Sequence, residues 1–304
     1  MRRPRISIGS LPMLIKDRLL KKSDTYLFIL PAIVLTIGIL YPFFLSVYYS
    51  LTDYHLGSTT LHFVGIKNYL DLFRDASFWK SLELTVGYTA ASLVIQIGLG
   101  LAGALLLHNE VKGIKIARSL IILPLMMPPV IAALMWKIIM APNGILNNII
   151  GLKEFGWLGT NASALPSILI IDSWIYTPFV IVILLAGLQS LPQEPYEAAR
   201  LDGGSGWFIF RKLTLPMLKP FIFVAALFRT IDSLKTFDIV YATTKGGPGS
   251  STMLLQVKAY FTSFRHYNMG SALAMMLVLW VVVYIMSRIL VRFRAQSSKN
   301  ALGR

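Results

Sequence analysis

Four charged residues, Arg229, Asp232, Lys235 and Asp238, follow one another at intervals of three residues in an otherwise apolar stretch. On an α-helix this spacing places the side chains along one slowly drifting face. Ionisable groups inside a membrane-spanning segment face a water-filled cavity or pair with one another. Two interpretations are equally supported: two neutral pairs, Arg229 with Asp232 and Lys235 with Asp238, or the lining of a path for a polar solute.

Hydroxyl-bearing and aromatic residues extend this candidate site. They offer hydrogen bonds and a ring face of the kind that a sugar binds, and a second apolar segment adds a carboxylate and a tyrosine. Pro178 lies close to that second pair, so a kink that serves only packing is an equal alternative there. The candidate path residues are Asp172, Tyr176, Arg229, Asp232, Ser233, Lys235, Thr236 and Phe237.

Hydrolytic and metal chemistry are not expected. The chain has no cysteine, which excludes thiolate metal ligands and disulfides. Its four histidines, His55, His62, His108 and His266, are isolated from one another and mostly at the edges of predicted loops. We therefore predict no catalytic residue, no metal site and no enzyme activity in this chain.

The elements that carry these residues are predicted to be membrane helices. Of 304 residues, 55% are hydrophobic and 14% charged, with a mean hydropathy of +0.65. Apolar runs of about 20 residues, enough to cross a hydrocarbon core, recur along the chain. The predicted fold is an all-α membrane protein with six transmembrane helices, at about 26–51, 84–107, 119–140, 167–189, 220–241 and 269–291. Pro124, Pro128 and Pro129 should bend or interrupt the third.

Positive charge is distributed unequally between the loops. Nineteen Lys and Arg residues lie in the termini and the even-numbered loops, against seven in the odd-numbered loops, which places both termini in the cytoplasm. This asymmetry and anionic lipid account for the net charge of +15, so no nucleic-acid partner is predicted. The expected organisation is a basic cytoplasmic tail (1–25), a transmembrane domain (26–292) and a cytoplasmic tail (293–304).

The loop between the fourth and fifth spans, 190–219, contains the sequence EAARLDGGSGWFIFRKLTLP. Pro192 and Pro195 favour a helix start, and Gly203 with Gly204 should end that helix. Ser205 is a predicted N-cap of a second short helix through Lys212, which Pro216 should stop. Charged and aromatic groups on two short helices suit a docking surface.

This loop also resembles the EAA loop through which permeases of bacterial binding-protein-dependent ABC importers contact their ATPase. The matching pattern is EAA, three residues, Gly203, nine residues, then Leu213-x-Leu215-Pro216, with Leu213 in place of the commoner isoleucine. The resemblance implies that Glu197 pairs with a basic group of the ATPase, that Gly203 forms the turn, and that Ala198 and Ala199 allow close approach. The implied coupling residues are Glu197, Ala198, Ala199, Asp202, Gly203, Leu213, Leu215 and Pro216.

Further phrases resemble the carbohydrate branch of that family, which imports oligosaccharides and glycerol phosphate. They are FVGIKNY at 63–69, and Phe237-Asp238 followed by TKGGPGSST at 244–252. The resemblance implies a sugar permease in the bacterial inner membrane, with a second homologous permease, an extracytoplasmic solute-binding protein and two ATP-binding cassette subunits. ATP and Mg would bind those subunits, and no cofactor binds this chain. The alternatives are a non-sugar solute, an ion-coupled secondary transporter using Asp172 or Asp232, and a membrane-embedded enzyme.

Overall fold

The computed structural model describes residues 22–108, 113–152 and 154–301. Regular structure in these ranges is helical, and extended pairing there is limited to two isolated bridges, Thr52 with Phe63 and His55 with Asn268. Helices satisfy their own backbone hydrogen bonds, as hydrocarbon requires. The predicted all-α fold is confirmed.

Helices occupy each of the six predicted spans. Within the described ranges, five helices are long and apolar enough to cross a membrane, and the number is six when the bent helix pair is counted as one span. The spans are α2 (Lys22–Ser50), α4 (Ala76–His108), the pair α5 (Ile114–Met126) and α6 (Pro129–Ile139), α8 (Ala164–Gln189), α11 (Leu215–Leu234) and α14 (Met269–Ala301).

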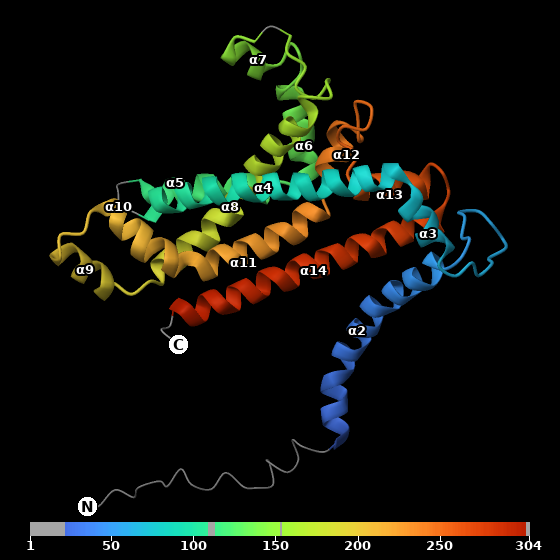
Figure 1. Ribbon diagram of the computed structural model, residues 1–304, viewed down its shortest axis with the longest axis horizontal. Coiled ribbons are helices and arrows are strands. Elements are labelled where there is room, and N and C mark those ends of the chain that lie inside the picture. The colour runs from blue at the N-terminus through green and yellow to red at the C-terminus, as the bar shows by residue number, and fades with distance from the viewer. Residues whose placement is uncertain (1–21, 109–112, 153, 302–304) are drawn as a thin grey trace, which may run out of the picture.

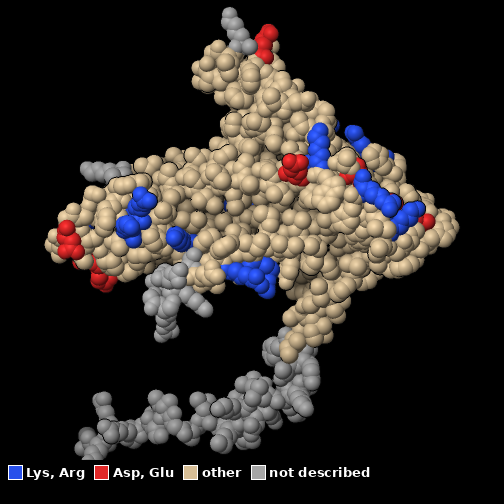
Figure 2. Space-filling model, viewed as in Figure 1, with Lys and Arg blue, Asp and Glu red and all other residues tan. Residues whose placement is uncertain are grey.

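Helices α4, α11 and α14 run along the long axis of the molecule, and α8 packs obliquely against α4 and α11 (Figure 1). Short helices α9 (Glu194–Leu201) and α10 (Gly206–Ile209) form a hairpin at one end. The opposite end, called the distal end below, carries α3 (Lys67–Arg74), α12 (Asp238–Thr243) and α13 (Leu255–Phe264). Figure 2 shows charged side chains at both ends, where the upper projection joins the body and in one basic patch midway along the lower edge, with a broad uncharged surface between them.

The third span is interrupted where its prolines predict. Helices α5 and α6 meet at an angle of 98°, and the two residues between them, Met127 and Pro128, have ψ angles of 138° and 131°. Each precedes a proline, whose ring excludes the α conformation from the residue before it. Helix α6 therefore leaves the bundle sideways, towards the short helix α7 (Ile145–Ile150) (Figure 1).

The fifth span ends earlier than the predicted Tyr241. Helix α11 stops at Leu234, where the N–H groups of Lys235 and Thr236 bond only three residues back, to Asp232 and Ser233. Asp238 then starts the separate helix α12, so the four charges do not share one helical face. The charged and polar residues Asp232, Ser233, Lys235 and Thr236 make a continuous helix in contact with lipid unfavourable here.

Small residues bring α4 and α8 into close contact. A β-carbon placed on Gly100 would lie 2.8 Å from Cβ of Val180, and one on Gly103 would lie 2.6 Å from Cδ1 of Ile181. Gly98, in contrast, faces open space. Gly100 and Gly103 therefore allow α4 and α8 to approach closely.

We expect Gly100→Ala to lower the free energy of unfolding by about 1–3 kcal/mol, because the added methyl group overpacks the α4–α8 contact. Gly98→Ala is the matched control, and it should be neutral or stabilising by up to about 1 kcal/mol through helix propensity. Unfolding of the purified variants in mixed micelles measures both values. Equal stability of the two variants would contradict the packing described.

Candidate functional site

Five of the eight predicted path residues line one cavity of about 190 Å³. Tyr176 comes from α8, Asp232 from α11, and Lys235, Thr236 and Phe237 from the junction of α11 and α12. This cavity, called the junction pocket below, is completed by Pro129, Asp238 and Ile239. The structure thus brings together rings, charges and a hydroxyl group from three helices.

The junction pocket lies where two spans lose their helical backbone. Pro129 begins α6 immediately after the break in the third span, and Lys235, Thr236 and Phe237 separate α11 from α12. Helices α6 and α12 pack against each other, so the two breaks are neighbours. Irregular backbone at membrane depth is tolerated where it is buried in protein or lines a water-filled cavity. The two breaks therefore provide both the space and the polar groups of the pocket.

The other three predicted path residues, Asp172, Arg229 and Ser233, are fully buried behind the pocket wall. Nε of Arg229 donates to Oε1 of Gln96 at 2.6 Å, and Nη2 donates to Oγ of Ser233 at 3.1 Å and lies 3.4 Å from Asp172. Asp172 also accepts from Ser92 Oγ at 2.6 Å and from Gln96 Nε2 at 2.7 Å. We call these five residues the buried cluster. It joins α4, α8 and α11.

Ser92 and Gln96 were not predicted as site residues. Their span was recognised by its lack of charge, and an uncharged amide does not interrupt an apolar run. Gln96 was nevertheless a visible signal, because a buried amide needs hydrogen-bond partners on a neighbouring helix. Its side chain bonds both the cation and the anion of the cluster.

Of the two ion pairs expected from the sequence, one forms and the other does not. Arg229 Nη1 lies 3.5 Å from Asp232, so the first expected pair forms, although Arg229 also pairs with Asp172 of another helix. The second expected pair does not form among the described residues, because the helix break separates Lys235 from Asp238. Both of these side chains line the junction pocket instead.

Aromatic rings continue from the junction pocket into the neighbouring helices. The rings of Phe237 and Tyr241 stack with centroids 5.0 Å apart, and Tyr260 of α13 lies 5.1 Å from Phe237. On the opposite wall, the guanidinium carbon of Arg229 lies 4.0 Å from the centroid of the Tyr176 ring. Polar groups among aromatic faces can hold a hydroxylated ligand.

The hairpin places the predicted coupling residues on and near its surface. Glu197, Ala198, Asp202 and Gly203 are exposed, and Ala199, Leu213, Leu215 and Pro216 are partly buried. Gly203 has a φ of +77°, which makes the left-handed turn, and Ser205 Oγ caps α10 by accepting from the N–H of Phe208. Leu201, which was not predicted, is 89% exposed, and Trp207 and Phe208 of α10 are also exposed.

The expectation that Pro216 ends the second hairpin helix is wrong. Helix α10 passes through a π-helical turn, η1 (Phe210–Thr214), directly into α11, so the helical backbone is continuous from Gly206 to Leu234. Proline removes an N–H donor and its ring clashes with the carbonyl four residues back. A π-helical turn widens the backbone just before Pro216, which explains how the helix continues.

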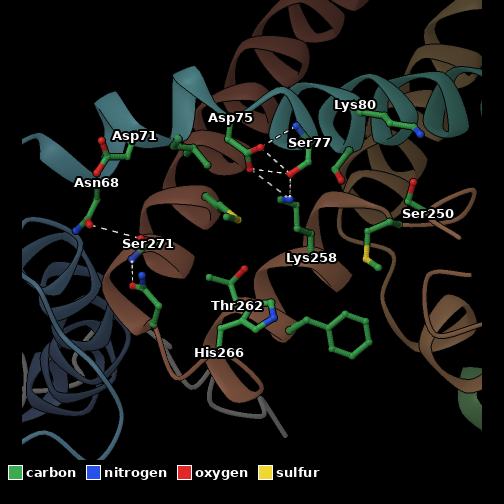
Figure 3. A pocket seen from close by; sticks show the side chains of 16 residues that line it. Asn68, Asp71, Asp75, Ser77, Lys80, Ser250, Lys258, Thr262, His266 and Ser271 are labelled. Atoms are coloured by element: carbon green, nitrogen blue, oxygen red, sulfur yellow. Dashed lines mark hydrogen bonds and ion pairs between the residues drawn. The ribbon is translucent and has the colours of Figure 1, made fainter.

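A separate cavity of about 560 Å³ lies at the distal end, where α3, α4, α13 and α14 meet (Figure 3). Lys258 Nζ bonds Oγ of Ser77 and lies 3.4 Å from Asp75. Partial burial opposes ionisation of Asp75, but hydrogen bonds from Ser77 and the charge of Lys258 outweigh it and lower the pKa of Asp75 below 3.8. This contribution to stability is present above pH 3.8 and is lost as the pH falls through the lowered pKa. Within the described residues, no group of three potential metal ligands is present.

The bent span, the hairpin and the bundle define a multi-span membrane permease. A model of the family described as the inner membrane component of binding-protein-dependent transport systems matches residues 96–296. The chain belongs to this family. It is therefore an inner-membrane transport subunit rather than an enzyme.

Named relatives and solved structures agree with the family. A trehalose/maltose permease of Thermococcus litoralis is 39% identical over 227 residues, covering 73% of this chain and 77% of its own. A trehalose permease of Mycobacterium tuberculosis is 30% identical over 279 residues, covering 91% and 90%. The fold matches a bacterial ABC transporter that imports the acidic polysaccharide alginate, with a TM-score of 0.79 at 21% identity over 94% of this chain and 99% of that one.

We expect Arg229→Gln to lower the free energy of unfolding by about 3–5 kcal/mol, because it leaves the buried carboxylate of Asp172 without a cation. The double variant Arg229→Gln with Asp172→Asn removes both charges and should recover at least about 1 kcal/mol of this loss. The measurement is a double-mutant cycle. It compares the unfolding in mixed micelles of the wild type, the single variants Arg229→Gln and Asp172→Asn, and the double variant. Strictly additive effects would show that the two residues are not coupled.

Proposed function

We propose that this chain forms one half of the translocation path for a sugar or oligosaccharide, and that the solute passes through the junction pocket. The observation that carries the proposal is the convergence of Tyr176, Asp232, Lys235 and Thr236 on one cavity at the breaks of two spans. Ring faces pack against the C–H surface of a sugar, while carboxylate, ammonium and hydroxyl groups bond its hydroxyls. The printed names of relatives, trehalose/maltose, trehalose and starch degradation products, support a sugar.

We propose that the α9–α10 hairpin docks onto an ATP-binding cassette subunit, with ATP and Mg bound there. Exposed Leu201, Trp207 and Phe208 offer an apolar centre for such an interface, and Glu197 and Asp202 offer charges around it. Because α10 continues into α11, a displacement of the hairpin would reach Asp232 at the wall of the junction pocket. Two such subunits would serve this chain and a second permease.

The second permease is proposed to pack beside α2. In the 18 most apolar residues of Ile29–Ser50 no side chain is buried, and the helix leaves the bundle from its distal end (Figure 1). Lipid and a homologous permease would together cover this surface. The excess of Lys and Arg on the hairpin side supports a cytoplasmic hairpin and cytoplasmic termini, which leaves the distal end for the binding protein.

A non-sugar solute is the alternative. Methionine and amino-acid ABC transporters share the fold at TM-scores of 0.55 and 0.54, over 72% and 78% of this chain. The sugar is favoured by the carbohydrates in the printed names of relatives, and the rings of Tyr176 and Phe237 in the junction pocket offer flat faces for it.

We expect Tyr176→Ala and Asp232→Asn each to lower ATP-driven uptake of maltose or trehalose about tenfold, the effect of losing one hydrogen bond to a charged group or one ring contact. Radiolabelled uptake into proteoliposomes that contain both permeases, the ATPases and the binding protein measures this effect. Thr230→Val is the matched control, because Thr230 is fully buried in the same helix and its hydroxyl has no protein partner. Wild-type uptake by both pocket variants would reject the proposed path.

We expect Leu201→Asp to abolish ATP-driven uptake while leaving insertion and folding unchanged, because the side chain is 89% exposed and has no packing role within the chain. Docking is measured directly by co-purification of the ATPase subunits with this chain. The variant Leu201→Asp should lose this co-purification. Leu152→Asp makes the same change at a 42% exposed position just after α7, away from the hairpin, and is the matched control. Full uptake by Leu201→Asp, or uptake without ATPase subunits, would reject the coupling role.

A further inference from the structure

We propose that Arg229 is a positioning residue that sets the sugar selectivity of the junction pocket without touching the solute. Its guanidinium would fix two groups of the pocket wall, the ring of Tyr176 and the carboxylate of Asp232. The inference rests on the proposed passage of a sugar through that pocket. The proposal assigns a role to the charge of Arg229, which is fully buried behind the pocket wall.

The guanidinium plane of Arg229 is fixed from behind by three helices. Nε bonds Gln96 of α4, and Nη2 bonds Ser233 of α11 and lies beside Asp172 of α8. Arginine presents its five N–H donors in a rigid planar fork, so bonds along one edge set the orientation of the whole group. Arg229 is 0% exposed, and water does not compete for these bonds.

The remaining parts of the same group face the junction pocket. Nη1, which makes no hydrogen bond, lies 3.5 Å from Oδ2 of Asp232, and the guanidinium carbon lies 4.0 Å from the Tyr176 ring centroid. The Asp232 side chain is 52% exposed. The attraction of the buried cation favours those rotamers of Asp232 that keep its carboxylate beside Nη1, whereas a carboxylate without this ion pair samples its rotamers more freely.

Selectivity follows from this rigidity. A carboxylate only accepts hydrogen bonds, so a fixed Asp232 accepts best from a sugar hydroxyl at one position and one orientation. A fixed Tyr176 ring defines the plane against which the sugar packs. Sugars that differ only in hydroxyl placement or linkage geometry are then distinguished, and they are distinguished less when the wall groups move freely.

A purely structural role for Arg229 makes a different prediction. If the cation only neutralises Asp172, its loss lowers uptake of all sugars in the same proportion, through fewer folded transporters. The positioning role instead changes the ratio of uptake rates between two sugars. That ratio is independent of how much transporter is folded.

The test compares uptake of maltose and trehalose by the complete transporter in proteoliposomes, each sugar presented on saturating binding protein. The variant Arg229→Gln with Asp172→Asn removes both buried charges and so avoids an unpaired ion. We expect its maltose-to-trehalose ratio to move towards one by about fivefold or more, as expected when a fixed hydrogen bond becomes mobile. Thr230→Val should keep the wild-type ratio.

An unchanged ratio in the double variant overturns the proposal, whatever the absolute rate. If that variant does not assemble, Arg229→Lys replaces it. Lysine keeps the charge beside Asp172 but lacks the planar fork, so the ratio should again move towards one, and a wild-type ratio overturns the proposal. Altered ratios in Tyr176→Ala and Asp232→Asn with an unchanged ratio in both Arg229 variants would reject the positioning role alone. Unchanged ratios in all four would reject the proposed path as well.

Discussion

The arrangement of the bundle depends on keeping one cation, Arg229, out of contact with lipid. A charged group at membrane depth is stable only with partners, and the nearest carboxylate on its own helix, Asp232, is half exposed. The remaining partners come from α4 and α8, which must therefore lie within hydrogen-bond distance of α11. Gly100 and Gly103 of α4 make this approach possible, because larger residues would hold α8 away. Packing and charge neutralisation thus select the same three helices.

The need to keep polar groups out of contact with lipid also explains where the helical backbone is interrupted. The third span breaks at Met127 and Pro128, and the fifth span breaks after Leu234. A single break in lipid would expose unpaired carbonyl groups, whereas two neighbouring breaks enclose a common polar space. The side chains that stop α11 are also those that line this space. The same residues therefore end the helix and form the pocket.

Much of this could be predicted from the sequence, and the failures have physical causes. Hydropathy located all six spans, and local chemistry located the proline break, the Gly203 turn and the Ser205 cap. Hydropathy could not locate the end of α11, because Ile239, Val240 and Tyr241 are apolar whether they continue that helix or begin another. The partners of Arg229 were also hidden, since Gln96 and Asp172 are 133 and 57 residues away and only the packing of α4 and α8 identifies them. The sites themselves remain predictions.

The continuity of α10 with α11 determines what kind of movement the hairpin can transmit. Had Pro216 ended the helix, the hairpin would be joined to the fifth span by a flexible link that absorbs displacement. The π-helical turn instead makes Gly206–Leu234 one helical segment, roughly 43 Å long at 1.5 Å per residue. Its far end carries Arg229 and Asp232, and Arg229 is bonded to α4 and α8. A displacement of the hairpin would therefore move these three helices as a group, and change the junction pocket where α11 meets α6 and α12, which lie outside that group.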